Sequence, residues 1–541
     1  MTLASVYYGS ALYDLTLWAR PPAGLAITWP RTWSGDAARG AALEAGEFRF
    51  AGEVVPSESP PWNAATVGQP FLAALHGFCW LGDLLAAPGA APSRAAAWTE
   101  AWLDHCDAWT PVAWRADVLA DRLTAWTEHF GAIARDGEFR ARLMQSYVRQ
   151  ARHLNRVAGR GRPGLQRLAA LRGLAVACVA LDRPVRLRRA LDRLLREVET
   201  QILPDGGHVE RSGRAQYNAV RYLIETRDAL RAGGIEVPPA LQSAIEHATP
   251  MLRFFRHGDN RFALFNGTNE DEATRIEQVL HRADAWGRPP AAAPHLGFQR
   301  LQAGRTLVIM DTGVPAPPAI DDDAHAGTLS FEMSHGKERL IVNCGAYTGP
   351  NAEWQTTARA TAAHSTLVVA DHNSAQIRPT GGLGRRPNEV ICERAEDLGS
   401  QWVEASHDGY YGTFGLMHRR RLFLSADGND LRGEDRLAGP AGQNFCLRFH
   451  LHPGVQVSLI QDGTAALLRL PGGVGWRLRV QGAVISIADS VYLGGDCVRK
   501  SCQLALDGHV GTSGALVKWA LKREQRAEPK RPDEGDDGDG G

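Results

Sequence analysis

Apolar residues recur at intervals of three and four through the first half of the chain and at intervals of two through the second half. Between about residues 68 and 230, segments such as WTEAWLDHCDAW and VRLRRALDRLLREVETQIL have the spacing of amphipathic helices. Short breaks that contain Pro or Gly, such as Thr110-Pro111 and Arg183-Pro184, separate these segments. The pattern predicts antiparallel helical hairpins, as in helical toroids and solenoids, up to a last helix near residue 286.

A Pro-rich linker, RPPAAAP at residues 288–294, marks the point where the period changes. Beyond it, segments such as GTLSFEMSHGKERLIVNCG alternate apolar and polar residues, with Gly and Asp-Gly turns between them. We therefore expect a large antiparallel β-sandwich from about residue 297 to residue 521. An earlier stretch, GEFRFAGEVV, has the form of a short hairpin that leads into the helices.

The 541 residues are too many for one hydrophobic core, so at least two domains are expected. We place a domain of helical hairpins at residues 1–290 and the sandwich at residues 291–522, which makes the chain an α+β multidomain protein. Residues 523–541 are charged and Gly-rich and lack large apolar side chains, which is typical of a disordered tail.

The amino-acid composition and net charge of the chain indicate which kinds of partner it can bind. Hydrophobic residues make up 44% of the chain and charged residues 22%, as in ordinary globular proteins, and the formal net charge is zero. A zero net charge argues against nucleic acid as a partner. The eight cysteines show no zinc or redox spacing. No apolar run is long enough to span a membrane, and the N-terminus lacks the pattern of a secretory signal peptide.

The stretch QILPDGGHVERS, at residues 201–212, is the most promising place for a site. Pro204 ends the preceding helix, and the Asp-Gly-Gly that follows can adopt backbone conformations closed to bulkier residues. His208 and Arg211 leave this turn three residues apart and could supply a proton-transfer group and an anion clamp side by side. We expect both to lie on an exposed loop and to face the sandwich across the domain interface. A turn with solvated polar side chains is the alternative.

Two His-centred segments of the sandwich could form a small metal site. His325 and His364 each stand at the entry to a predicted strand, and Asn343 ends the apolar strand between them. Two imidazoles and an amide oxygen could together hold one divalent, zinc-like ion. Lone histidines at strand ends more often serve as ordinary hydrogen-bonding groups, which is the alternative here.

Four segments together resemble the heparinase II/III-like family: LPDGGHVERS, FRHGDNRFALFNG, HAGTLSFE followed by LIVNCG, and AHSTLVV. The resemblance covers most of the chain. It implies an α/α toroid paired with an antiparallel β-sandwich, and activity as a polysaccharide lyase on polymers that contain uronic acid. Relatives are mostly envelope or periplasmic proteins, so the resemblance implies the cell envelope. No export signal is visible here, and without export the protein would be cytoplasmic.

The family's chemistry is β-elimination beside a carboxylate, which needs a cation over the carboxylate, a base for the C5 proton and an acid for the departing O4 oxygen. The resemblance assigns His208 and Arg211 to the helical half of this site. In relatives a His-x-His motif precedes the Leu-Ser-Phe strand; Asp323 takes the place of its first His, and His325 is the second. The resemblance also makes His325 and His364 ligands of a structural metal. The third ligand is Asn343, which replaces a carboxylate and should weaken zinc binding.

The family's catalytic Tyr has no counterpart at its usual position. No Tyr occurs between residues 229 and 294, and the region that should hold one has His257, Asp259 and Asn260 instead. Either other groups take over, or lyase activity is lost. The groups that could take over are His257, Tyr217 and Tyr347.

The sequence thus gives a set of predicted site residues. The expected catalytic residues are His208, Arg211, Tyr217 and His257. The expected substrate contacts are Glu210, Asn260 and Asp323.

Three functions fit the sequence. The first is β-elimination of an anionic, uronate-containing polysaccharide or oligosaccharide. The second is a catalytically impaired carbohydrate-binding or envelope protein on the same scaffold, which the missing Tyr and the presence of Asp323 favour. The third is a glycoside hydrolase, which needs two facing carboxylates, here Asp205 or Glu210 with Glu270 or Asp271.

Overall fold

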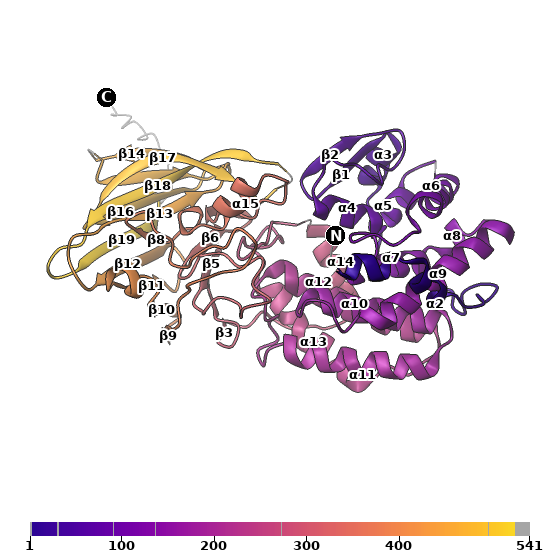
Figure 1. Cartoon of the computed structure of the whole chain (residues 1–541). Helices are drawn as coiled ribbons and strands as arrows, with labels where there is room; N and C mark the ends of the chain where they lie inside the picture. Colours follow the sequence, from indigo (N-terminus) through magenta and orange to yellow (C-terminus); the bar gives the residue numbers. More distant parts are fainter. Residues whose placement is uncertain are drawn as a thin grey trace, which may run out of the picture.

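The computed structural model of the chain describes residues 3–524, except residues 30, 31, 90, 136, 272, 462 and 496. Figure 1 shows two lobes, with the helices of the first half of the chain on one side and the strands of the second half on the other. The predicted architecture is confirmed: a helical domain is followed by a large antiparallel β-sandwich.

The helical domain begins earlier than the periodicity predicts, because three short helices precede residue 68. The predicted hairpin GEFRFAGEVV is present as β1 (Glu47–Phe50) and β2 (Glu53–Pro56). The helices are α1 (Leu3–Tyr8), α2 (Ala11–Leu17), α3 (Ala37–Glu44), α4 (Gln69–His76), α5 (Leu81–Ala86), α6 (Ala91–Cys106), α7 (Ala116–Glu128), α8 (Phe130–Ile133), α9 (Gly137–Val157), α10 (Leu165–Ala180), α11 (Pro184–Gln201), α12 (Gly213–Ala232), α13 (Pro239–Phe254) and α14 (Ala273–Ala283).

Helix α10 forms the centre of the helical domain. Every residue from Leu168 to Ala180 is buried, because α7, α9, α11 and α12 pack around this helix. Gly173 allows α7 to approach closely, since a Cβ atom at this position would lie only 2.4 Å from Ala120. Helix α11 lies further out and is amphipathic: it buries Leu187 and Leu194 and exposes four of its five arginines.

The sandwich consists of two antiparallel sheets. One has the strand order β14-β15-β16-β19-β12-β11-β10-β9, and the other has the order β17-β18-β13-β7-β6-β5-β4-β3, with β8 paired to β13. The strands are β3 (Ala292–Ala293), β4 (Phe298–Ala303), β5 (Thr306–Asp311), β6 (Phe331–His335), β7 (Glu338–Val342), β8 (Leu367–Val369), β9 (Val390–Asp397), β10 (Ser400–His407), β11 (Met417–Leu424), β12 (Asp430–Ala438), β13 (Asn444–Leu451), β14 (Gln456–Ile460), β15 (Ala465–Arg469), β16 (Gly475–Gln481), β17 (Val484–Tyr492), β18 (Arg499–His509) and β19 (Ala515–Arg523). Two short helices, α15 (Ala352–Ala358) and α16 (Tyr411–Phe414), lie in the connections between strands.

The burial of the strands shows where the helical domain covers the sandwich. Strands β11 and β12 alternate buried and less buried residues, as a period of two predicts. Strands β5 and β6 are buried throughout. Phe298, Leu307 and Ile309 of the sandwich pack into the hydrophobic core of the helical domain, so the outer face of β4 and β5 is the surface on which the two domains meet.

Arg211 joins the two domains. Its Nε donates to the Leu296 carbonyl at 2.7 Å, and its terminal NH2 group lies 3.0 Å from the Gly297 carbonyl and 2.5 Å from Asp311 Oδ1. The guanidinium also covers the Phe298 ring at 4.8 Å. Both charged side chains are buried, with 7% and 5% of their surfaces exposed. Burial raises the pKa of Asp311, an effect that the Arg211 charge opposes.

Two expectations concern the rest of the chain. Strand β19 ends at Arg523, and residues 525–541 of the expected tail lie outside the described residues. Within the part of the chain that the structure describes, no helix is long and apolar enough to cross a membrane.

We predict that Arg211→Ala lowers the free energy of unfolding by about 3–5 kcal/mol, because it leaves the Asp311 carboxylate buried without its partner. Urea unfolding of the full chain measures this change. Arg188→Ala, which removes an exposed arginine of α11, is the matched control and should change the free energy by less than about 0.5 kcal/mol. Equal stability of the two variants would show that the ion pair does not join the domains.

Candidate active site between the helical domain and the sandwich

His208 is enclosed in the turn after α11. The residue is 1% exposed. Nδ1 accepts a hydrogen bond from the Glu210 backbone N–H at 3.3 Å, so the proton lies on Nε2, which donates to Gln201 Oε1 at 2.8 Å. Burial lowers the pKa of His208 to about 3, so the ring is neutral. The expectation of an exposed loop is therefore wrong for both His208 and Arg211. Their catalytic roles stay predictions, and this burial does not favour them.

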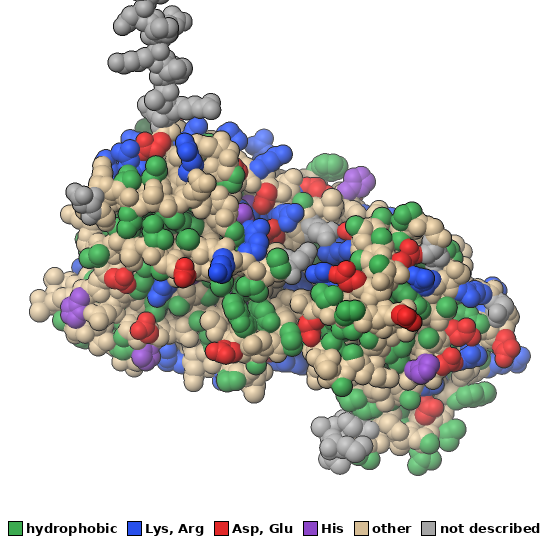
Figure 2. All heavy atoms as spheres, turned by 90° about the horizontal axis from the view of Figure 1, so that it is seen from above, with side chains coloured by type: hydrophobic (Ala, Val, Ile, Leu, Met, Phe, Trp, Pro, Cys, Tyr) green, Lys and Arg blue, Asp and Glu red, His purple; other side chains and the backbone are tan. Residues whose placement is uncertain are grey.

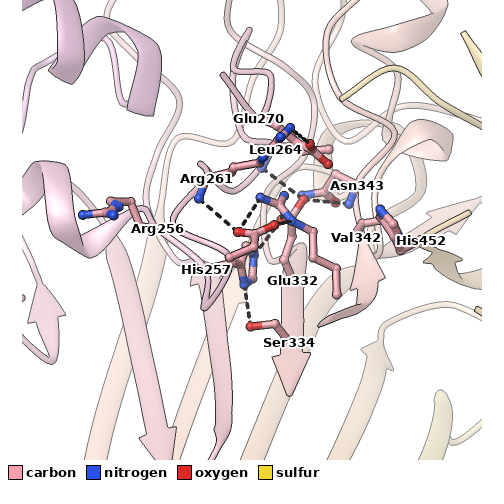
Figure 3. Close-up of polar contacts among 12 residues, drawn as sticks. Arg256, His257, Arg261, Leu264, Glu270, Glu332, Ser334, Val342, Asn343 and His452 are labelled. Atoms are coloured by element: carbon pink, nitrogen blue, oxygen red, sulfur yellow. Dashed lines mark hydrogen bonds and ion pairs between the residues drawn. The ribbon is translucent and has the colours of Figure 1, made fainter. Parts of the chain in front are cut away.

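His257 follows α13 and reaches into the sandwich (Figure 3). Its Nδ1 lies 2.9 Å from Ser334 Oγ and its Nε2 lies 3.0 Å from Glu332 Oε2. The other oxygen of the buried Glu332 accepts the backbone N–H groups of Leu264 and Asn343 at 3.1 and 2.8 Å. Burial lowers the pKa of His257. Both ring nitrogens of this predicted catalytic residue thus serve to link the two domains.

The turn after His257 contacts the hairpin between β6 and β7. Gly258 approaches this hairpin so closely that a Cβ atom would lie 1.8 Å from the Gly336 carbonyl oxygen. Asp259 accepts a hydrogen bond from Arg339 Nε at 2.9 Å. Asn260, a predicted substrate contact, is exposed and closes the turn with a φ of +67°. This turn therefore has a structural role, while the Asn260 side chain is exposed.

The carboxylates that a hydrolase would need have separate partners. Glu270 accepts hydrogen bonds from Tyr492 Oη and from Arg261, the latter at 2.8 Å. Asp205 accepts the Leu296 backbone N–H at 2.8 Å. Asp205 and Glu270 are each held by their own neighbours, which does not favour them as a facing pair of carboxylates.

His325 and His364 lie together, as predicted, but they are linked directly. The Gly267 backbone N–H donates to His325 Nε2 at 3.1 Å, which places the His325 proton on Nδ1. That proton is donated to His364 Nε2 at 3.0 Å, and His364 Nδ1–H donates to the Ala360 carbonyl at 2.7 Å. Burial lowers the pKa of His325 well below its usual range and that of His364 to about 4. Each of the four ring nitrogens thus has a hydrogen-bond partner while both imidazoles are neutral.

Asn343, the third predicted ligand, does not offer its oxygen to a metal. Its Oδ1 accepts the Ser365 backbone N–H at 2.9 Å, and its buried Nδ2 has no hydrogen-bond partner among the described residues. An amide N–H donor cannot bind a cation. Over the same residues, no group of three or more His, Cys, Asp or Glu side chains could hold a metal ion. The arrangement of His325, Asn343 and His364 therefore does not fit the predicted zinc-like ion.

One face of α12 carries polar side chains that remain accessible. Arg214, Tyr217, Asn218 and Arg221 are the exposed or partly exposed residues of the first two turns, and their spacing of three and four places them on one side of the helix. Glu225 follows one turn later and accepts from Arg221 Nε at 2.7 Å. We call the first four residues the α12 face. It begins at the end of α12 that lies beside the sandwich.

Figure 2 shows a hollow between the two lobes, along which Lys and Arg side chains gather. Arg275, on α14, contributes a further positive charge near Tyr217 and is paired with Asp83 at 3.1 Å. Burial raises the pKa of the Tyr217 phenol, while Arg221 and Arg275 lower it, so the phenol keeps its proton at neutral pH. Tyr217 is thus a candidate proton donor between two cations.

Asp323 lies close enough to Arg214, the first residue of the α12 face, and to Glu210 for their charges to interact. Asp323 is accessible and packs against Gly267, where a Cβ atom would lie 2.7 Å from the Asp323 Cβ. Desolvation by the surrounding protein raises the pKa of Asp323, and the positive charge of Arg214 partly offsets this rise. Glu210 accepts the Leu165 backbone N–H at 2.7 Å, and burial raises its pKa to about 7. Both predicted substrate contacts are therefore carboxyl groups with raised pKa values.

Sequence reasoning missed Arg214, Asn218 and Arg221. The signal was present, because their spacing from Tyr217 is helical, but an Arg-rich helix is usually just a solvated face. The other candidate tyrosine, Tyr347, packs against Trp354, with ring centroids 5.7 Å apart.

We predict that Glu210→Gln changes how stability depends on pH. The pKa of Glu210 is about 7 in the folded chain and near 4.5 in the unfolded chain, so the folded state binds the proton more tightly. The stability that this group contributes is present below about pH 4.5 and is lost as the pH rises through about 7. The variant should therefore have a higher Tm than the unmodified protein at pH 8, and a similar Tm near pH 4. A Tm difference that stays constant with pH would contradict this assignment.

We also predict that metal removal leaves the protein unchanged. Chelation should leave Tm within about 1 °C, since the His325–His364 pair is already hydrogen-bonded, whereas loss of a structural zinc costs folding energy outright. Elemental analysis of the purified protein is the second measurement. One tightly held zinc ion per chain, with a lower Tm after chelation, would show that the two rings reorient around a metal.

Comparisons with known proteins agree with the fold and the motifs. The family description "Heparinase II/III-like, C-terminal" matches residues 286–520. A crystal structure of heparinase III is similar with a TM-score of 0.75 and 15% identity, covering 96% of this chain and 90% of that one. Heparan sulfate lyase HepC from Pedobacter heparinus is similar with a TM-score of 0.60 and 14% identity, covering 91% and 83%.

A curated relative matches over nearly the whole length. FtsZ-localized protein C from Caulobacter vibrioides (strain NA1000 / CB15N) is 31% identical over 547 residues, which cover 96% of this chain and 94% of that protein. The structural similarities, at about 15% identity, establish the toroid-and-sandwich fold alone. Together with the family match and this relative, they show that the chain belongs to the heparinase II/III-like family.

Proposed function

We propose that the protein binds an anionic, uronate-containing polysaccharide or oligosaccharide along the α12 face and cleaves it by β-elimination. The observation that carries this proposal is the α12 face itself, which places a protonated phenol between accessible arginines at the junction of the two domains. Large ligand sites form preferentially where domains meet. The lyase fold supports the proposal as an analogy.

Arg221 is the best placed cation for the uronate carboxylate. Glu225, itself held by Arg172 at 3.2 Å and by Trp33 Nε1 at 2.8 Å, fixes the Arg221 side chain through Nε. The side chain is 28% exposed, so its terminal nitrogens are available for a two-pronged contact with a carboxylate. Neutralising that carboxylate makes the C5 proton more acidic.

Tyr217 and Asp323 are the proton-transfer groups in this proposal. The Asp323 carboxylate takes the C5 proton, the C4–O4 bond breaks as the C4=C5 double bond forms, and the Tyr217 phenol gives its proton to the departing O4 oxygen. Asp323 occupies the position of a His in relatives, and its raised pKa makes it a stronger base than an ordinary aspartate. The proton then returns from Asp323 to Tyr217 through solvent.

The test is a screen of uronate polymers, read both by the ultraviolet absorbance of the unsaturated product and by new reducing ends. Tyr217→Phe keeps the ring contact with Phe262 and removes only the proton. We expect it to lower kcat by about 10²–10⁴-fold with little change in binding, and Asp323→Asn to do the same. Arg188→Ala is the control and should leave kcat unchanged.

Three results would count against this mechanism. Full activity in both variants would place the chemistry elsewhere in the molecule. New reducing ends without ultraviolet absorbance would indicate a hydrolase. Tight binding of uronate oligosaccharides without any cleavage would indicate a carbohydrate-binding protein on a lyase scaffold.

The second candidate function is that of a non-catalytic protein which localises with FtsZ, at the cell envelope. The 31% identity to FtsZ-localized protein C over nearly the whole chain favours it, and so does the structural use of the expected catalytic histidines. A fluorescent fusion of the full chain, imaged together with FtsZ in the native cell, is the test. Co-localisation that persists in Tyr217→Phe, with no cleavage of any uronate polymer, would support this candidate over the lyase.

A further inference from the structure

The N-terminal helices expose an apolar surface at a place distinct from the α12 face. Helix α2 buries Tyr13 and Leu17 where it packs against α9. The opposite side carries Leu12, Leu15 and Trp18, spaced by three residues, with 78%, 70% and 66% of their surfaces exposed. Exposed large apolar residues gathered on one short helix are unusual for a surface that only contacts water.

The apolar surface continues on neighbouring segments. Val6 and Tyr7 of α1 are 57% and 60% exposed, and the Tyr7 ring lies 5.0 Å from that of Tyr13. We call Val6, Tyr7, Leu12, Leu15 and Trp18 the N-terminal apolar patch. Figure 1 places α2 beside α9, at the end of the helical domain farther from the sandwich.

A pocket with arginines at its edge adjoins this patch. It has a volume of about 260 Å³ and reaches from Ala19, directly after Trp18, to the ends of α9, α10 and α11. Leu174, Cys178 and Leu181 are among the residues that form its apolar floor. Its charged lining residues are all arginines: Arg152, Arg183 and Arg186.

These arginines form a positive cluster. Arg152 donates to the Thr16 carbonyl at 3.1 Å, while its buried Nε has no partner among the described residues. Burial lowers the pKa of Arg152, and the charges of Arg186 and Arg156 lower it further. Asp14 is paired with Arg149, the exposed Asp182 adjoins Arg183, and no acidic residue is among those that line the pocket in the described part of the chain.

We infer that the N-terminal apolar patch and the arginine pocket together dock the protein on a membrane surface that contains anionic phospholipids. Aromatic and aliphatic side chains insert at the boundary between headgroups and acyl chains, and arginines attract the headgroup phosphates. A pocket with an apolar floor and cationic edge suits a phospholipid, which has both kinds of group. The inference extends the proposed function, because the α12 face would then act on a glycan while the other end of the domain is held at a membrane.

The test is flotation of the full chain with vesicles of phosphatidylcholine alone or of phosphatidylcholine mixed with phosphatidylglycerol. We expect binding to the mixed vesicles, weaker binding to phosphatidylcholine, and release at high salt. Leu15→Ser together with Trp18→Ser should reduce the partition coefficient by roughly tenfold or more. Arg183→Ala together with Arg186→Ala should reduce it by about tenfold on mixed vesicles only.

Matched controls come from exposed residues elsewhere. Trp286→Ser removes a Trp that is 84% exposed outside the patch, and Arg188→Ala together with Arg189→Ala removes two exposed arginines of the same α11 helix. Both should bind vesicles like the unmodified protein, and all variants should keep its Tm. Equal flotation of the patch variants and the controls would overturn the inference. So would a patch variant that changes only the oligomeric state in light scattering, because the patch would then join two copies of the chain.

Discussion

The buried charges between the two domains constrain the structure around them. Arg211 with Asp311, and Glu332 with its three hydrogen-bond donors, lie where water cannot replace a lost partner. A buried charge without its partner costs several kcal/mol, so the segments that carry the partners must keep their positions. These segments are the turn after α11, the turn after α13, and strands β5 and β6. The turn after α11 leads directly into α12, so the start of the α12 face is held in place in this way.

The four histidines that stand out in the sequence are buried. His208, His257, His325 and His364 each have both ring nitrogens engaged, and burial lowers the pKa of each. A neutral, fully hydrogen-bonded imidazole can neither take a proton from a sugar nor bind a metal without rearrangement. The accessible polar groups of the α12 face are two arginines, a tyrosine and an asparagine, and the proposed elimination uses them together with Asp323. An arginine pairs readily with a uronate carboxylate, and a protonated phenol suits a departing sugar oxygen.

Much of the fold could be predicted from the sequence, because the apolar period changes from helical to alternating across the Pro-rich linker, and period follows directly from backbone geometry. The adjacency of His325 and His364 was also predictable. The burial of Arg211 was not, since its partners Leu296, Gly297 and Asp311 lie far along the chain and carry no local signal of the contact. A Gly-rich turn has the same sequence whether solvent or a second domain covers it.

The claim that the α12 face holds the uronate is tested most directly by a crystal structure of Tyr217→Phe with a bound uronate oligosaccharide. The account predicts a sugar carboxylate within about 3 Å of the Arg221 guanidinium, and the glycosidic oxygen facing the edge of the substituted ring, where the phenol oxygen of Tyr217 lies in the unmodified protein. An oligosaccharide bound away from α12, for example on the outer face of the sandwich, would contradict the account.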